Sequence, residues 1–143
     1  MLDPTEAALL RGLADAHDAS LPRLVYADWL DERGDAARAE FIRLQCEPTA
    51  AAEPEALRPR ERALLTAYRR EWCAGFGVPV EDVAFERGLL SAVRLKEWDG
   101  GRFLDPAIAP RFAMLTELDL SGLQLQDDDL TAFADSAQFP RLR

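Results

Sequence analysis

The sequence has few of the side chains that build metal and disulfide sites. It contains one histidine, His17, which excludes a site with several histidine ligands. Its two cysteines, Cys46 and Cys73, belong to separate predicted helices and share no short metal-ligand spacing. We expect both cysteines to be small buried hydrophobic residues without a disulfide. We also expect no metal and no cofactor.

Positive charge and long apolar runs are also scarce. The chain has 17 basic and 26 acidic residues, a net charge of −9, which disfavours nucleic acids and anionic membranes as partners. No apolar run approaches the roughly 20 residues of a membrane span. The N-terminus lacks the basic region of a signal peptide, residue 2 is not glycine, and the C-terminus has no cysteine. We therefore expect a cytoplasmic protein.

The first half of the chain has the spacing of helices. Asp3 and Pro4 predict a helix start, and Glu6 stands where a capping box has its acid. Apolar residues at three- and four-residue intervals then predict helices over about 4–17, 21–33, 36–46 and 59–74. Residues 47–59 contain three prolines, which predicts a loop. We expect the aromatic residues of these helices to fill one core: Tyr26, Trp29, Phe41, Tyr68 and Trp72.

After Gly75 the pattern changes to that of strands. Residues 83–85 and 89–95 predict two strands joined by a turn. The frame Leu90-x-x-Val93-x-Leu95 recurs 25 residues later (90 to 115) as Leu115-x-x-Leu118-x-Leu120. Residues 112–115 recur as 139–142, and both intervals are typical of leucine-rich repeats, whose apolar faces stack on one another. An ordinary α+β domain with two similar strands is the alternative.

These patterns predict an α+β fold in two parts. Residues 1–80 form a helical bundle, and residues 81–143 begin a short leucine-rich-repeat stack of parallel strands backed by short helices. Phe139 to Arg143 open a further repeat without a polar cap. We expect either that the chain is a fragment of a longer repeat protein or that self-association covers this end.

One long segment is more specific than a generic helix. Residues 22–35, Pro-Arg-Leu-Val-Tyr-Ala-Asp-Trp-Leu-Asp-Glu-Arg-Gly-Asp, are followed by Arg-Ala-Glu-Phe-Ile-Arg-Leu-Gln-Cys at 38–46. Together with Glu71-Trp72 and Phe85-Glu86-Arg87-Gly88, they closely resemble the bacterial repeat-companion domain of planctomycetes and myxobacteria, over about residues 5–95. The resemblance implies a helical module beside a repeat array and supplies no catalytic residue. Members usually continue through more repeats than this chain has.

Two groups of residues are candidate partner-binding positions. Tyr26 and Trp29 could form an exposed epitope with Asp28, or Trp29 could pack inside while Asp28 pairs with Arg23 or Arg38. The other group lies between the repeat leucines, on the concave face of a repeat stack. The repeat alignment places Ala92 beside Glu117, Arg94 beside Asp119, and Lys96 beside Ser121. The Arg94–Asp119 pair is either a surface ion pair worth at most about 1 kcal/mol or part of a mixed-charge recognition strip.

Three hypotheses for function follow. The first is a non-enzymatic protein–protein interaction scaffold that binds a partner protein through Tyr26, Trp29, Arg94, Lys96, Glu117, Asp119 and Ser121. The second is a regulatory or targeting adaptor whose helical module binds a partner directly. The third, a small hydrolase using acidic residues, ranks last because His17 has no triad spacing and the acids at 28, 31, 32 and 35 fall on different faces. Asp127 to Asp129 lack the spacing of a calcium loop and are expected to cap a helix.

Overall fold

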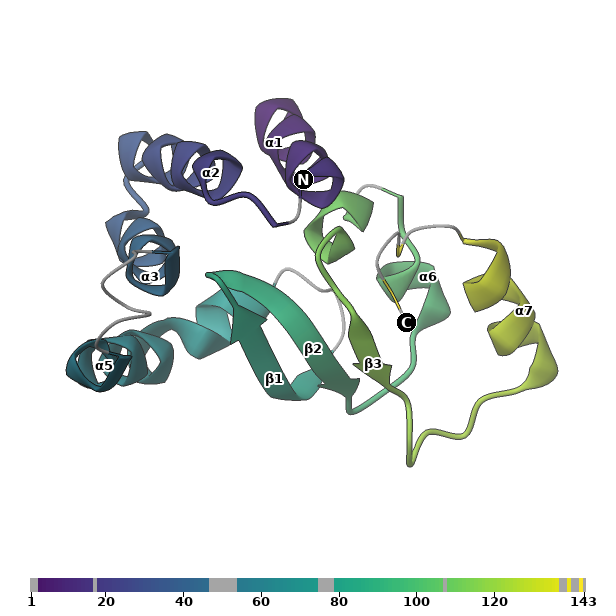
Figure 1. The fold of residues 1–143 in the computed structure, drawn as a ribbon. Coiled ribbons are helices and arrows are strands. Elements are labelled where there is room, and N and C mark those ends of the chain that lie inside the picture. Colours follow the sequence, from purple (N-terminus) through teal and green to yellow (C-terminus); the bar gives the residue numbers. More distant parts are fainter. Residues whose placement is uncertain are drawn as a thin grey trace.

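The computed structural model describes residues 3–16, 18–46, 54–74, 79–106, 108–136, 139 and 142. Helices α1 (Pro4–Asp15), α2 (Leu21–Glu32), α3 (Ala36–Cys46) and α5 (Pro54–Cys73) precede a hairpin of β1 (Val80–Glu86) and β2 (Leu89–Leu95). Helix α6 (Gly100–Phe103), the 3-10 helix η2 (Ala109–Phe112), strand β3 (Glu117–Asp119) and helix α7 (Asp127–Asp135) follow. Helices α3 and α5 lie at one end of the sheet and α7 at the other (Figure 1). The predicted α+β class is confirmed.

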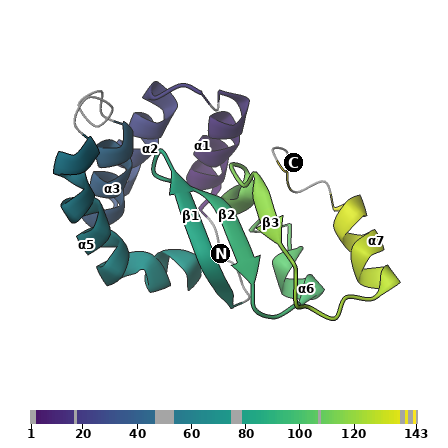
Figure 2. The same ribbon diagram turned by 60° about the horizontal axis from the view of Figure 1, so that its bottom comes forward.

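The three described strands lie side by side in the order β1-β2-β3 (Figure 2). The hairpin is antiparallel, whereas β2 and β3 are parallel. Ala92 pairs with Glu117 and Arg94 with Asp119, which is the register that the repeat alignment predicts. Lys96 and Ser121 lie outside this ladder because β3 ends at Asp119. The sheet thus joins one strand from each of two predicted repeat units, and the leucine-rich-repeat stack itself stays a prediction.

Local signals explain where the first helices begin and end. Asp3 caps α1 by accepting a hydrogen bond from the backbone N–H of Thr5, at 2.7 Å. Gly34, with φ at +90°, follows the end of α2 in a conformation that suits glycine. The predicted capping box at Glu6 is wrong. Its carboxylate instead accepts a hydrogen bond from the Tyr26 hydroxyl at 2.8 Å, and this bond joins α1 to α2.

The predicted loop over residues 47–59 is partly helical. Residues 47–53 of the predicted loop lie outside the described residues, but residues 54–59 belong to α5. Pro54 stands at the first helical position, which tolerates proline, and the next four residues (Glu, Ala, Leu, Arg) favour helices. Pro59 lies inside the helix, where it removes one backbone hydrogen bond because proline has no N–H. Helix α6 begins at Gly100, and the Asp99 side chain caps it by accepting from the backbone N–H of Arg102.

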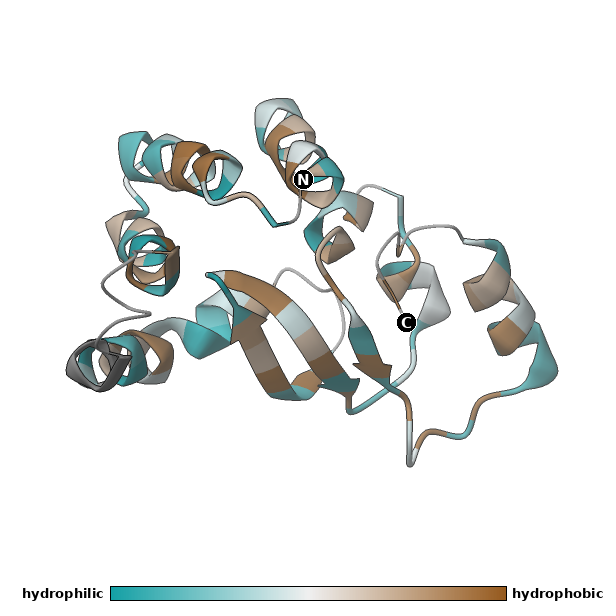
Figure 3. Cartoon of the chain, viewed as in Figure 1, coloured by the Kyte–Doolittle hydropathy of each residue, from teal (hydrophilic) through white to brown (hydrophobic). Residues whose placement is uncertain are grey.

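The buried side chains form two clusters. The first contains apolar residues of α1, α2 and α3, together with Leu89 of β2 and Met114. The second lies beneath the sheet and is centred on Val93, Leu95, Phe103 and other residues of the second half. Figure 3 shows hydrophobic residues along β1 and β2, the strands that contact both halves. Packing therefore continues across the predicted boundary near residue 80.

The aromatic residues do not fill one core. Tyr26 and Trp29 stack on each other within the first cluster, with ring centres 6.2 Å apart. Phe41 instead contacts Trp72 at 5.1 Å and Phe85 of β1 at 5.3 Å. Tyr68 stacks on Trp72 but is still 36% exposed. The prediction of one aromatic core is wrong because a strand residue, Phe85, takes part in the second group.

The cysteines differ in burial. Cys73 is buried as predicted, whereas Cys46 is half-buried, and its thiol donates to the Arg87 carbonyl oxygen at 3.4 Å. Both are free thiols. Burial raises the pKa of each of them, which keeps the thiols protonated and poorly reactive.

A two-residue turn attaches the hairpin to the helices. Arg87 and Gly88 have φ values of +50° and +88°, as tight hairpin turns require. The Arg87 guanidinium donates to the Asp18 carbonyl oxygen at 2.6 Å and to the Ser20 hydroxyl. The backbone N–H of Gly88 donates to the side chain of Gln45 at the end of α3. The turn therefore fixes β1 and β2 against the helices and positions the pocket described next.

Candidate functional site

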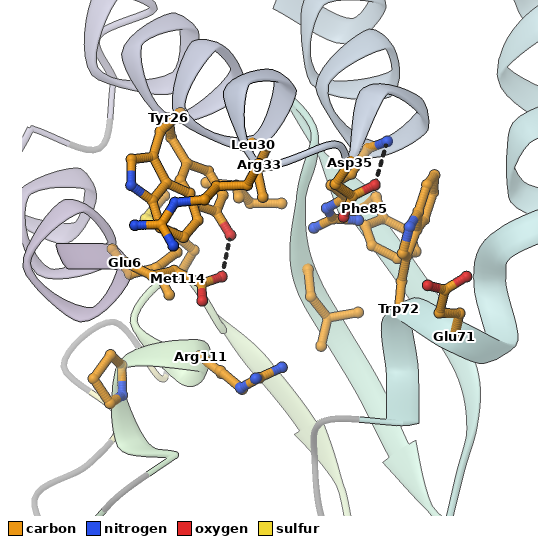
Figure 4. A pocket seen from close by; sticks show the side chains of 16 residues that line it. Glu6, Tyr26, Leu30, Arg33, Asp35, Glu71, Trp72, Phe85, Arg111 and Met114 are labelled. Atoms are coloured by element: carbon orange, nitrogen blue, oxygen red, sulfur yellow. Dashed lines mark hydrogen bonds between the residues drawn. The ribbon is translucent and has the colours of Figure 1, made fainter. Parts of the chain in front are cut away.

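A pocket of about 340 Å³ lies where the two buried clusters meet (Figure 4). Its lining comes from α1, α2, α3, α5, both strands of the hairpin and the η2 segment. We call it the central pocket. Its volume is within the range of small-ligand sites, roughly 300–1,000 Å³.

Aromatic rings line two sides of the central pocket. Tyr26 lies on one side, and Trp72 and Phe85 lie on the opposite side (Figure 4). Trp29, stacked on Tyr26, also lines the pocket. Such rings give the pocket apolar walls against which an apolar group can pack.

Arginines from three elements enter the same pocket. The Arg33 guanidinium lies over the Trp29 ring, 4.8 Å from its centre. Arg38 lies over Trp72 at 4.8 Å and over Phe85 at 5.2 Å, and burial lowers its pKa. Arg111 reaches in from η2 (Figure 4). The Nη1 atom of Arg38 and the Nε atom of Arg111 are buried and have no hydrogen-bond partner among the described residues. Buried donors of this kind are rare in proteins.

Three acids line the pocket, and two of them, Glu6 and Asp35, have structural roles, whereas Glu71 is exposed. Glu6 accepts from Tyr26, and burial followed by the charge of Glu6 raises the pKa of the Tyr26 hydroxyl. Arg38 and Arg111 oppose this rise, so both guanidinium groups act on the same hydroxyl. Asp35 accepts from the backbone N–H of Arg38 at 3.2 Å and so caps α3. These contacts give neither Glu6 nor Asp35 the free geometry of a catalytic acid.

A second group of charged residues lies on the exposed face of the sheet. Arg94 contacts Asp82 and Asp119, each at 3.0 Å, and Glu117 is exposed beside them. Asp119 also accepts from the backbone N–H of Ser121 at 2.8 Å. The hydrogen bonds from Ser121, followed by that from Arg94, lower the pKa of Asp119 to about 2. We call these residues, Asp82, Arg94, Glu117 and Asp119, the charged strip.

Comparison with protein-family models, curated proteins and solved structures gave no match. The resemblance to the repeat-companion domain therefore stays a prediction. None of the described helices is both long enough and apolar enough to cross a membrane. Among the residues that the structure describes, no three histidine, cysteine, aspartate or glutamate side chains are grouped as metal ligands would be.

The predicted partner-binding residues do not form one site. Tyr26 and Trp29 belong to the central pocket, Tyr26 being buried and Trp29 half-buried. Arg94, Glu117, Asp119 and Ser121 gather at the charged strip. Lys96 is exposed beyond the strand pairing, and its backbone N–H donates to the carbonyl oxygen of Pro79 at 3.0 Å.

The predicted partners of Asp28 are wrong. Arg43 donates to Asp28 at 2.6 Å and to Asp31 at 3.1 Å. Arg23 instead donates to the Ala19 carbonyl oxygen, and Arg38 lies among the rings of the pocket. Since Arg43 is on α3 and both acids are on α2, this contact depends on how the two helices pack, which helical spacing within one segment does not indicate.

Three further predictions concern His17, the acids at 127–129 and the repeated phenylalanine at 139. His17 lies outside the described residues. Asp127 to Asp129 begin α7 as predicted, with Gln126 and Asp129 forming a reciprocal cap. Phe139 packs against Phe103 and Phe112, with ring centres 5.5 and 5.3 Å away. The repeated phenylalanines at 112 and 139 are thus neighbours in the second cluster.

Replacing Arg94 with glutamine should raise the pKa of Asp119 only part of the way to its ordinary value near 3.8, because Ser121 contributes more to the shift than Arg94. A lowered carboxyl pKa means that the native state gains stability above the unfolded pKa and loses it as the pH falls from about 4 to 2. Titration of the Asp119 carboxyl carbon by NMR measures this. Arg102→Gln is the control, because Arg102 pairs with Asp99. An Asp119 pKa that Arg94→Gln leaves unchanged would contradict the assignment.

Proposed function

We propose that this protein is a non-enzymatic protein-binding scaffold of the repeat-companion type, in which a helical module covers the first strand of a leucine-rich-repeat stack. The supporting observation is the parallel pairing of β2 with β3 in the register of the 25-residue repeat. This register leaves Arg94, Glu117 and Asp119 on one face, while Val93 and Leu118 pack into the second cluster.

The charged strip is the surface that this proposal assigns to a protein partner. Its residues are exposed or half-buried, so they contribute little to folding and are available to oppositely charged groups. Complementary charges across an interface speed association and disfavour wrong partners. The strip contains three acidic residues and one arginine, so a partner that offers several basic groups beside one acidic group fits it best.

Reversing two charges of the strip should remove partner binding without unfolding the protein. In the double variant Arg94→Glu, Glu117→Lys the net charge is unchanged, since the two reversals cancel. We expect proteins captured from a lysate of the source cell by the wild-type chain to be reduced at least about tenfold. Quantitative mass spectrometry of the captured proteins measures this.

A matched control exchanges charges elsewhere. Glu40 and Arg60 form an exposed ion pair between α3 and α5 at 2.7 Å, so Glu40→Lys, Arg60→Glu makes the same net change at a distant surface. Equal capture by both double variants and by the wild type would contradict the assignment of the strip.

The exposed face of α2 favours the adaptor as a second candidate. Leu21 is 71% exposed and Val25 46% exposed, although large apolar side chains are usually covered. In the same capture experiment, binding that survives the strip variant but is lost in Val25→Glu would favour an adaptor that binds through α2.

A further inference from the structure

Two buried guanidinium nitrogens, on arginines that line the central pocket, have no acceptor in the part of the chain that the structure describes. They are Nη1 of Arg38, which comes from α3, and Nε of Arg111, which comes from η2. Both side chains line the same pocket, and both act on the Tyr26 hydroxyl. A buried charged donor without a partner costs more free energy than a neutral one. Because both arginines line one cavity, an acceptor of hydrogen bonds bound there would supply the partner that these donors lack among the described residues.

The chemistry of the donors favours an anion. Guanidinium groups hold carboxylates and other oxyanions through short, charge-assisted hydrogen bonds. Three acids also line the pocket: Glu6 accepts from Tyr26, Asp35 accepts from the backbone of α3, and Glu71 is exposed. None of them accepts a hydrogen bond from the two unpaired nitrogens. The buried side-chain groups of the pocket that lack a partner among the described residues are therefore cationic.

The walls of the pocket favour a flat apolar group beside the anion. Trp72 and Phe85 stand across the pocket from Tyr26 (Figure 4). Arg38 spans the two features, because its guanidinium lies over Trp72 and Phe85 while its Nη1 atom is unpaired. A volume of about 340 Å³ suits a ring with a short acidic chain and leaves little room for a larger cofactor.

We propose that the central pocket binds a small carboxylate that carries a planar apolar ring. The carboxylate accepts hydrogen bonds from Arg38 and Arg111, and the ring packs against the apolar side chains that line the pocket. The site is separate from the charged strip and does not depend on the scaffold function. Its ligand is either a free aromatic acid or the C-terminal residue of a peptide, since both present the same group.

The test uses the full chain and 3-phenylpropionate, with the uncharged 3-phenylpropionamide as a matched probe. Binding is followed in NMR spectra through the indole N–H signals of the three tryptophans. We expect the acid to shift the signals of Trp29 and Trp72, which line the pocket, and to leave Trp98, which does not. The amide should bind at least about tenfold more weakly, because it loses the charge-assisted bonds.

Variants connect the binding to the two arginines. Arg111→Gln should weaken the acid at least about tenfold and leave the affinity for the amide within about twofold. We expect the same changes in affinity for Arg38→Met. If that variant does not fold, the result with Arg111→Gln alone tests the proposal. Arg102→Gln, which removes the same charge from an exposed site on α6, should bind like the wild type.

The outcomes separate the possibilities. Equal binding of the acid and the amide, binding of neither, or full binding by Arg111→Gln would overturn the proposal. The tripeptide Gly-Gly-Phe with a free C-terminus distinguishes the sources: tighter binding than 3-phenylpropionate supports a peptide ligand, and weaker binding supports a free acid. Because these probes do not involve the charged strip, their failure leaves the scaffold proposal standing, and loss of protein capture leaves the pocket standing.

Discussion

Replacing Gly88 with alanine should lower the free energy of unfolding by roughly 2–5 kcal/mol. An alanine Cβ at this position would lie 2.6 Å from the Cα atom of Ile42 and 2.7 Å from its Cγ1 atom. Backbone atoms cannot give way as the end of a flexible side chain can, so the turn would have to move away from α3. The φ of +88° adds the strain of a left-handed conformation.

Gly34 provides the matched control for this prediction. Its φ is +90°, almost the same as that of Gly88, but an added Cβ would meet no atom within 4 Å. Gly34→Ala should therefore cost only the backbone strain, about 1 kcal/mol. Thermal and urea unfolding of the two variants, followed by circular dichroism, compares them. Equal losses would mean that the close approach of the turn to α3 is unimportant for stability.

The substitution at Gly88 should also affect the central pocket, because the turn joins the two strands that line it. Phe85 precedes it, and Leu89 and Leu90 follow it. Arg87 ties the same turn to Asp18 and Ser20. A shift of the turn would therefore change the spacing between the strand side of the pocket and the helices that supply Arg38.

The order of the helices and strands could be predicted because local signals determine it. Asp3, Gly34 and Asp35 act at helix ends through their own backbone neighbours. The pairing of Arg94 with Asp119 was also predictable, although the residues are 25 positions apart. A repeat fixes the register between strands, because a slip of one residue would turn the leucines to solvent.

The central pocket could be predicted only in part. Tyr26 and Trp29 stood out as aromatic residues beside an acid, and both line the pocket. Nothing in the spacing of Arg38 or Arg111 distinguishes them from solvent-exposed arginines. Their burial depends on how α3, η2 and the hairpin pack together, which is a property of tertiary structure. The helix over residues 54–58 could not be predicted for a simpler reason: Pro48, Pro54 and Pro59 favour a loop, and this signal opposes the helix propensity of the residues between the last two.

Removing residues 1–75 should abolish cooperative unfolding of the remainder. Leu89 and Met114 are buried against side chains of the first three helices, including Leu13 and Ile42, and would become exposed. The hairpin turn would also lose its contact with Gln45. The remainder keeps the hairpin, β3, the short helices and most of the second cluster, but this small core buries too little apolar surface to compensate for these losses.

Circular dichroism during heating and light scattering at several concentrations test this expectation, since exposed apolar strands associate. Adding residues 1–75 as a separate chain is the control, because a helical module that acts by packing should restore a cooperative transition without a covalent link. A shortened chain that remains monomeric and unfolds cooperatively would contradict the idea that the helices cover the first strand. Restoration in trans, by contrast, would show that the two halves recognise each other through the first buried cluster, the same contact on which the central pocket depends.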